Sequence, residues 1–206
     1  MVQTIQAQTI TLADLQRQFS LQWVDDAQSF PEWQTDLPEI SEFQQRQLGN
    51  IRAGFINFLH HQPLLENIVR MVVLDPLLFV GEFYLAPFYV RSEDPIEIAV
   101  AAEDVVIRGR IDTLIVRDQL WVTVIESKQA AFSVEMGLAQ TLAYMFANPQ
   151  QNRPTYGLIT TGGTFLFLKL YADQGWKYNT SSIFVTRNPG DLEQVLRILK
   201  RLSQAA

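Results

Sequence analysis

Hydrophobic residues recur along the chain at two spacings, and each spacing predicts a different kind of element. Leucines and valines at every third or fourth position near residue 195 follow the period of an amphipathic helix. Short runs of β-branched and aromatic residues between polar or glycine-containing segments predict strands instead. The pattern predicts helices over residues 12–19, 41–71 with a break near Pro63, 133–147 and 192–202, and strands over residues 82–90, 95–101, 109–116, 120–128 and 182–186. This mixture predicts an α/β protein with a mixed central β-sheet flanked by α-helices.

The length and composition indicate a globular chain with a sizeable core. It has 206 residues, of which 48% are hydrophobic and 11% aromatic, enough for one domain or for a core with an accessory segment. We expect residues 1–40 to form an N-terminal accessory segment packed on the core, and residues 41–206 to form the main domain. Trp23, Phe30 and Trp33 would anchor this segment, or alternatively stack on nucleic-acid bases.

Several features of the sequence point to a cytoplasmic protein without a membrane partner. No apolar run approaches the roughly 20 residues that a membrane-spanning helix needs, and Asp75-Pro76 interrupts the nearest one. The first residues lack the basic start and apolar stretch of a signal peptide. The chain has no cysteine, which excludes a disulfide framework and a thiolate metal site.

One aspartate, one glutamate and one lysine stand within the largely apolar strands predicted over residues 109–116 and 120–128, namely Asp112, Glu126 and Lys128. A short polar connection predicts a hairpin, which would place Asp112 and Glu126 near the same end of neighbouring strands. Because adjacent strands lie roughly 5 Å apart, two carboxylates there could share one divalent cation. Side chains alternate along a strand, so Lys128 shares the face of Glu126 and could steer or activate water. Alternatively, these are ordinary charges at a frayed hairpin end.

The helix predicted over residues 133–147 carries two further polar side chains that could belong to the same site. Ser133 suits an N-cap, and the helix must pack beside the hairpin that precedes it. Gln140 and Tyr144 are four residues apart and lie one above the other on such a helix. Both could face a metal centre or a phosphate, although a purely structural role accounts for such a pair equally simply.

Together, the motifs Gly109-x-x-Asp112, Glu126-x-Lys128 and Gln140-x-x-x-Tyr144 resemble the PD-(D/E)xK nuclease superfamily, and look most like its RecB-like branch. Residues 156–170 resemble a strand-turn-strand of the N-terminal nuclease domain of type I restriction enzyme motor subunits. The resemblance covers roughly residues 50–171, and Ile111 departs from it where the family name has proline. No helicase or ATPase motif accompanies it.

This resemblance implies a restriction-endonuclease-like core and a nuclease that uses Mg²⁺, with Mn²⁺ as a possible substitute, on nucleic acid, expected to be DNA. Asp112, Glu126 and the carbonyl of Ser127 would bind the metal, and Glu66 is a further candidate ligand or else a solvated residue of a first helical turn. Lys128 would orient or deprotonate the attacking water, or stabilise charge on the phosphate. Gln140 and Tyr144 would support the site or touch the nucleic-acid backbone.

The charge balance is unfavourable for a protein that binds nucleic acid on its own. The net charge is −6, which repels a polyanion. Arg108 and Arg110 could form a local phosphate-contacting strip, or could instead pair with Glu103, Asp104 or Asp118. We therefore expect a homodimer or a partner subunit to assist binding. A non-catalytic nucleic-acid-binding or assembly module that retains the fold is the alternative function.

Overall fold

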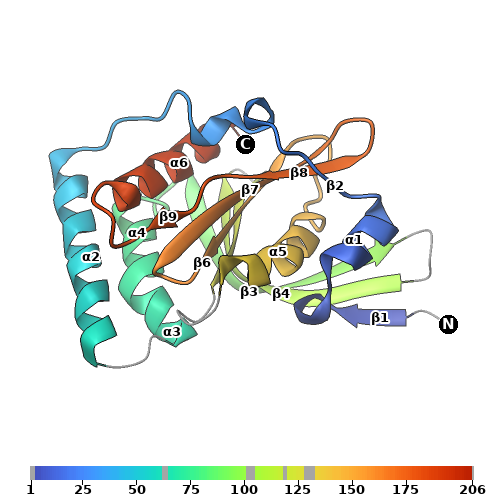
Figure 1. Ribbon diagram of the computed structural model, residues 1–206, viewed down its shortest axis with the longest axis horizontal. Coiled ribbons are helices and arrows are strands. Elements are labelled where there is room, and N and C mark those ends of the chain that lie inside the picture. Colours follow the sequence, from blue (N-terminus) through green and yellow to red (C-terminus); the bar gives the residue numbers. More distant parts are fainter. Residues whose placement is uncertain (1–2, 62–64, 101–104, 118–119, 128–132, 206) are drawn as a thin grey trace.

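The computed structural model describes residues 3–61, 65–100, 105–117, 120–127 and 133–205. As predicted, the chain is of mixed α/β class, with one large mixed sheet flanked by helices (Figure 1). The strands are β1 Gln3–Gln6, β2 Gln22–Trp23, β3 Phe88–Val100, β4 Val105–Arg117, β5 Leu120–Ser127, β6 Thr155–Thr160, β7 Thr164–Ala172, β8 Trp176–Thr180 and β9 Phe184–Val185. The α-helices are α1 Leu12–Phe19, α2 Glu42–His61, α3 Glu66–Val69, α4 Asp75–Val80, α5 Leu138–Met145 and α6 Asp191–Ala205.

Strand β4 organises the sheet, whose order is β1-β4-β5-β6-β7-β8-β2. One side of β4 pairs antiparallel with β3 along almost its whole length. The other side pairs first with β1, in parallel, and then with β5, antiparallel. Beyond them, β5 and β6 are parallel, β6 to β8 are antiparallel, and β2 adds in parallel to β8. The sheet is therefore mixed in direction, and its strands come from both ends of the chain.

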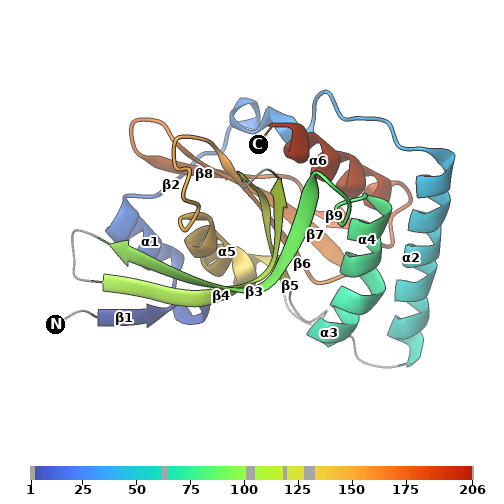
Figure 2. The same ribbon diagram turned by 180° about the vertical axis from the view of Figure 1, so that it is seen from behind.

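Helices cover both faces of the sheet and define two hydrophobic cores (Figures 1 and 2). On one face, buried residues of α2, α4 and α6 pack together with Phe165 and Phe167 of β7. On the other face, α1 and α5 pack against β4, with Leu15, Ile107 and Tyr144 fully buried. This second face carries the helix that holds the predicted Gln140 and Tyr144.

The helices with the clearest hydrophobic periodicity occur as predicted. Helix α1 has the predicted bounds, and a capping box between Thr11 and Asp14 closes its first turn. The buried leucines of α6 form the predicted stripe. Helix α2 begins after Ser41, whose side chain accepts a hydrogen bond from the backbone N–H of Gln44. The break predicted near Pro63 lies outside the described residues; from Glu66 the helical path runs further than predicted, through α3, a π-helical segment Arg70–Leu74 and α4.

Two strand predictions are wrong in their bounds. Residues 82–87 form a turn, and β3 begins at Phe88. The N–H of Phe83 closes the end of α4 by donating to the carbonyl of Leu78, Glu82 has φ of 67°, and the Phe83 ring is buried. The aromatic run therefore packs a turn and not a strand. Of the strand predicted over residues 182–186, Phe184–Val185 pairs with β7.

Three strands were not predicted, namely β1, β2 and β8. Their sequences are short and mostly polar, so periodicity gives little sign of them. Through β1 and β2, residues 3–40 contribute strands to the sheet itself. Within the described part of the chain, no helix is both long and apolar enough to span a membrane.

Candidate functional site

A β-bulge in the hairpin of β4 and β5 sets the two predicted metal-binding carboxylates opposite each other. Near the turn, Val116 pairs with Trp121, whereas after the bulge Thr113 pairs with Ile125. The next positions along this ladder are Asp112 and Glu126. Without the one-residue shift, Asp112 would oppose Ile125 and point away from the face of Glu126, because side chains alternate along a strand. The bulge therefore brings the two acids to one face.

The two carboxylates differ in burial. Glu126 is 1% exposed and Asp112 is partly exposed, while Leu114 is fully buried beside them on the strand. The backbone carbonyl of Asp112 accepts a hydrogen bond of 3.1 Å from Ser92 Oγ, which in turn accepts one from Arg70 at 3.1 Å. These contacts fix the backbone of Asp112 from the neighbouring strand β3 and from the π-helical segment.

Tyr144 and Gln140 of α5 lie against this pair of acids. Gln140 Nε2 donates a 2.8 Å hydrogen bond to the Tyr144 hydroxyl, and both side chains are buried. Burial raises the pKa of Tyr144 to about 12, with further contributions from the charges of Glu126 and Asp112; hydrogen bonds from Gln140 and from the backbone of Arg110 act in the opposite direction. The charges of both carboxylates thus act on the phenol, whose ring packs over Gly109 of β4.

Two glycines allow α5 to lie this close to the sheet. A Cβ atom on Gly109 of β4 would lie 2.7 Å from Tyr144 Cε1, and one on Gly157 of β6 would lie 2.8 Å from Met145 Sδ. At Gly109 the distance is shorter than a carbon contact can be, so a larger residue would displace the Tyr144 ring and its helix; at Gly157 the Met145 side chain would have to move. Gly109 belongs to the motif Gly109-x-x-Asp112, and its structural role is to seat the Tyr144 ring. Sequence analysis did not identify this role.

The remaining predicted site residues have different positions. Ser127 pairs with Thr160 of β6 in the parallel ladder, which holds its backbone next to Glu126. Lys128 lies outside the described residues. Glu66 is the first residue of α3. Across residues 3–61, 65–100, 105–117, 120–127 and 133–205, no three Asp, Glu, His or Cys side chains gather as a metal site, so Glu66 does not join the two acids here.

The donor set at this point nevertheless fits a hard divalent cation. Carboxylates on adjacent strands and a backbone carbonyl beside them offer oxygen ligands, which Mg²⁺ prefers, and Mg²⁺ commonly takes one or two carboxylates and keeps several waters. The effect of both carboxylates on the pKa of Tyr144 supports their convergence. Asp112, Glu126 and Ser127 are therefore the residues that could hold such an ion.

The structure does not decide between the two alternatives for Arg108 and Arg110, because Glu103, Asp104 and Asp118 lie outside the described residues. Arg108 Nε donates a 2.9 Å hydrogen bond to Glu97 of β3, which is none of the three acids named as alternatives. Arg110, two residues before Asp112 on the same strand, is exposed. One arginine is thus placed beside the candidate site with its side chain on the surface.

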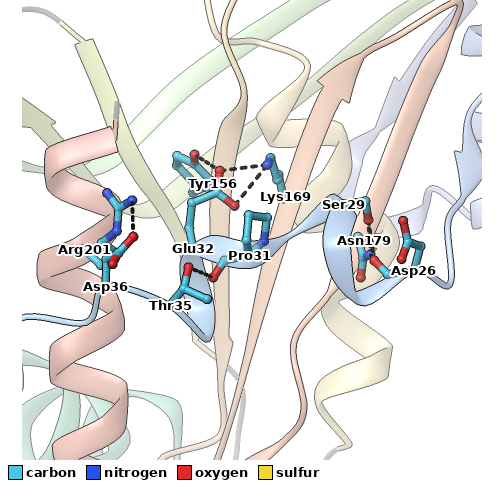
Figure 3. Close-up of polar contacts among 10 residues, drawn as sticks. All are labelled: Asp26, Ser29, Pro31, Glu32, Thr35, Asp36, Tyr156, Lys169, Asn179 and Arg201. Carbon is cyan, nitrogen blue, oxygen red and sulfur yellow. Dashed lines mark hydrogen bonds and ion pairs between the residues drawn. The ribbon is translucent and has the colours of Figure 1, made fainter.

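A second polar cluster, which sequence analysis missed, lies on the opposite face of the sheet (Figure 3). Lys169 Nζ of β7 donates to both carboxylate oxygens of Glu32, at 2.8 and 3.0 Å, and Tyr156 of β6 donates to one of them at 3.0 Å. Burial and the Glu32 charge raise the pKa of Tyr156 well above its usual value. All three side chains are mostly buried and satisfy one another, so the cluster clamps residues near Glu32 to the sheet. A lone lysine in the apolar run of β7 was the available signal.

Comparison with known proteins gives no independent assignment. The chain matches no protein-family model, and a search of curated proteins finds no match. The assignment of the site therefore depends on the residues and contacts described above.

Proposed function

We propose that the protein is a Mg²⁺-dependent nuclease of the PD-(D/E)xK type, which hydrolyses phosphodiester bonds of nucleic acid on a restriction-endonuclease-like core. DNA is the proposed substrate. The observation that carries the proposal is the bulge that sets Asp112 opposite Glu126, beside the buried pair of Gln140 and Tyr144. If the two acids were only solvated charges at the end of a hairpin, Glu126 would be exposed. Its exposed fraction is instead 1%.

In this proposal the two carboxylates and the carbonyl of Ser127 hold the ion. A bound Mg²⁺ supplies a water of lowered pKa and neutralises charge on the phosphate in the transition state. Lys128, two residues beyond Glu126, orients or deprotonates the attacking water or stabilises the phosphate charge. These roles come from the family resemblance, and the geometry of the two acids supports them.

The contacts of Gln140 and Tyr144 indicate a more specific role for these two side chains. With a pKa of about 12, the Tyr144 hydroxyl stays protonated near neutral pH. It accepts from Gln140, so its own hydrogen remains free to be donated to a carboxylate or phosphate oxygen. Gln140 fixes the direction of that donation. The pair therefore orients the acids or the substrate and transfers no proton.

Cleavage assays on plasmid DNA, single-stranded DNA and RNA with Mg²⁺ or Mn²⁺ test the proposal. The variants are Asp112→Asn and Glu126→Gln, which keep the shape of each side chain and remove its charge. Glu97→Gln is the matched control, because Glu97 is an exposed acid on β3. We expect metal-dependent cleavage that falls by on the order of 10²–10³-fold in the site variants and is unchanged in the control. Metal-independent cleavage, or equal activity in all variants, would refute the proposal.

The alternative function is a non-catalytic nucleic-acid-binding or assembly module that retains the fold. Two observations favour it: the net charge of −6, and the absence of a third acid beside the pair in the part of the chain that the structure describes. Thermal unfolding with and without Mg²⁺ separates the two functions. Selective binding to the folded state raises the melting temperature, so a rise that Glu126→Gln abolishes supports the nuclease, and no rise supports the module.

A further inference from the structure

A cluster of exposed hydrophobic side chains lies around α2, α4 and the turn that follows α4. We call it the apolar face and define it by five residues. Their exposed fractions are 56% for Phe43, 56% for Met71, 72% for Phe79, 43% for Tyr84 and 61% for Leu85. Soluble monomers rarely leave large apolar side chains exposed in one continuous patch, so this face is a candidate interface.

The apolar face is hollowed as well as protruding. One cavity of about 680 Å³ is lined by Met71, Phe79 and Tyr84, and an adjacent one of about 440 Å³ is lined by Phe43, Phe79, Tyr84 and Leu85. The two cavities share Phe79 and Tyr84, so they form one surface. Hollows beside protruding rings are what a surface needs in order to interlock with a copy of itself.

The local backbone contributes to this exposure. Met71 belongs to the π-helical segment Arg70–Leu74, where the extra residue per turn widens the helix. Val73 and Leu74 of the same segment are fully buried, while Met71 points outward into the larger cavity. Segments of this kind are rare and frequently occur at functional sites, which agrees with a function for this face.

Area and charge indicate which partner fits. Aromatic side chains can bury 150–250 Å² each, so five large side chains exposed to these extents offer on the order of 500 Å². A standard interface takes about 800 Å² from each partner, and the rims of the cavities can supply the rest. Those rims carry both signs of charge, with Asp75 and Glu82 acidic and Lys200 basic. A nucleic-acid surface would be mainly basic, whereas a self-pairing surface needs both signs.

We propose that the apolar face pairs with the same face of a second copy of this chain, which gives a two-fold symmetric dimer. Helices α2 and α4 cover the face of the sheet opposite to α5 (Figure 2). Pairing there does not involve α5, which carries Gln140 and Tyr144. The proposal does not depend on the proposed nuclease function.

Sedimentation equilibrium and light scattering of the full chain test the dimer. Measurements up to about 100 µM would detect a Kd near 10 µM. We expect a mass twice that of one chain for the native protein, and at least a tenfold rise in Kd for Phe79→Glu and for Leu85→Glu. Trp23→Glu is the matched control, because Trp23 is 58% exposed on β2, outside the apolar face. Circular dichroism checks that each variant is folded.

Three results would overturn the proposal. The first is a native protein that is monomeric over the whole concentration range. The second is a dimer that persists in the folded variants Phe79→Glu and Leu85→Glu, since it would then use another surface. The third is open-ended growth beyond the dimer, which indicates pairing between two different surfaces.

Discussion

Replacing Gly109 with alanine is the most direct test of how the candidate site is assembled. The added Cβ would lie 2.7 Å from Tyr144 Cε1 and 2.8 Å from Ala7 Cβ. Neither neighbour can move aside easily, because both are fully buried and Ala7 has no further side-chain bond to rotate. Overpacking of a filled core costs about 1–3 kcal/mol. With two close contacts against buried groups, we expect a loss of about 2–3 kcal/mol in the free energy of unfolding for Gly109→Ala.

Urea denaturation gives this free energy, and a glycine in open space gives the control. A Cβ atom added to Gly49 in α2 would have no neighbouring atom within 4 Å, so Gly49→Ala should stabilise the protein by about 0.5–1 kcal/mol. In the double variant Ala7→Gly with Gly109→Ala, one close contact disappears, and we expect a favourable coupling of about 1 kcal/mol. If Gly109→Ala costs less than about 0.5 kcal/mol, Tyr144 is not seated against β4 as described.

Four further predictions follow from the same contacts. Deleting Val122, which the bulged ladder skips between Trp121 and Thr123, should give a regular hairpin that keeps Thr113 opposite Ile125 and Asp112 opposite Glu126; cleavage and any Mg²⁺-induced rise in melting temperature should both survive in the folded variant, and their loss would contradict this register. Tyr144→Phe removes the acceptor of the Gln140 hydrogen bond and should lower stability by about 1–3 kcal/mol in urea unfolding, with reduced cleavage and unchanged metal affinity. The folded pKa of Tyr144, about 12, lies above its usual value, so the contribution of the protonated phenol to the free energy of unfolding should be fully present below pH 10 and be lost as the pH rises from about 10 to about 12. Urea unfolding followed by circular dichroism over this pH range checks the sign, and the decline should be shallower in Tyr144→Phe. Lys169→Met leaves Glu32 charged and mostly buried and should cost about 3–5 kcal/mol, whereas Lys169→Met with Glu32→Gln should recover part of that loss, and equal stability of the two variants would show that the clamp is not electrostatic.

Elements that are determined by residues close together in the sequence could be predicted from the sequence alone. Helices α1 and α6 follow from periodicity and capping, and the hairpin of β4 and β5 follows from two apolar runs around a polar turn. The turn at Gly162, where φ is 74°, lies within the strand-turn-strand expected over residues 156–170. In each case the residues that determine the element lie within the element.

Features that depend on distant residues could not be predicted. Strands β1 and β2 are polar and short, and they form because β4 and β8 offer free edges far along the chain. The bulge at Val116 was also missed, although the predicted meeting of Asp112 and Glu126 depends on it. A count of residues from the turn would have placed the acids on opposite faces, so the register that aligns Asp112 with Glu126 depends on a bulge that the sequence pattern did not predict. The clamp of Glu32 on Lys169 joins residues that no local pattern connects.

The pairing of β1 and β2 has a consequence for how the protein folds during synthesis. Gln3 pairs with Val105, and Gln22 pairs with Lys177. Strands β1 and β2 are therefore synthesised well before β4 and β8, the strands with which they pair. Contacts this distant in sequence slow folding, since a long loop must close before they form. We expect a late folding step, in which the beginning of the chain docks onto a sheet that the middle and the end have already built.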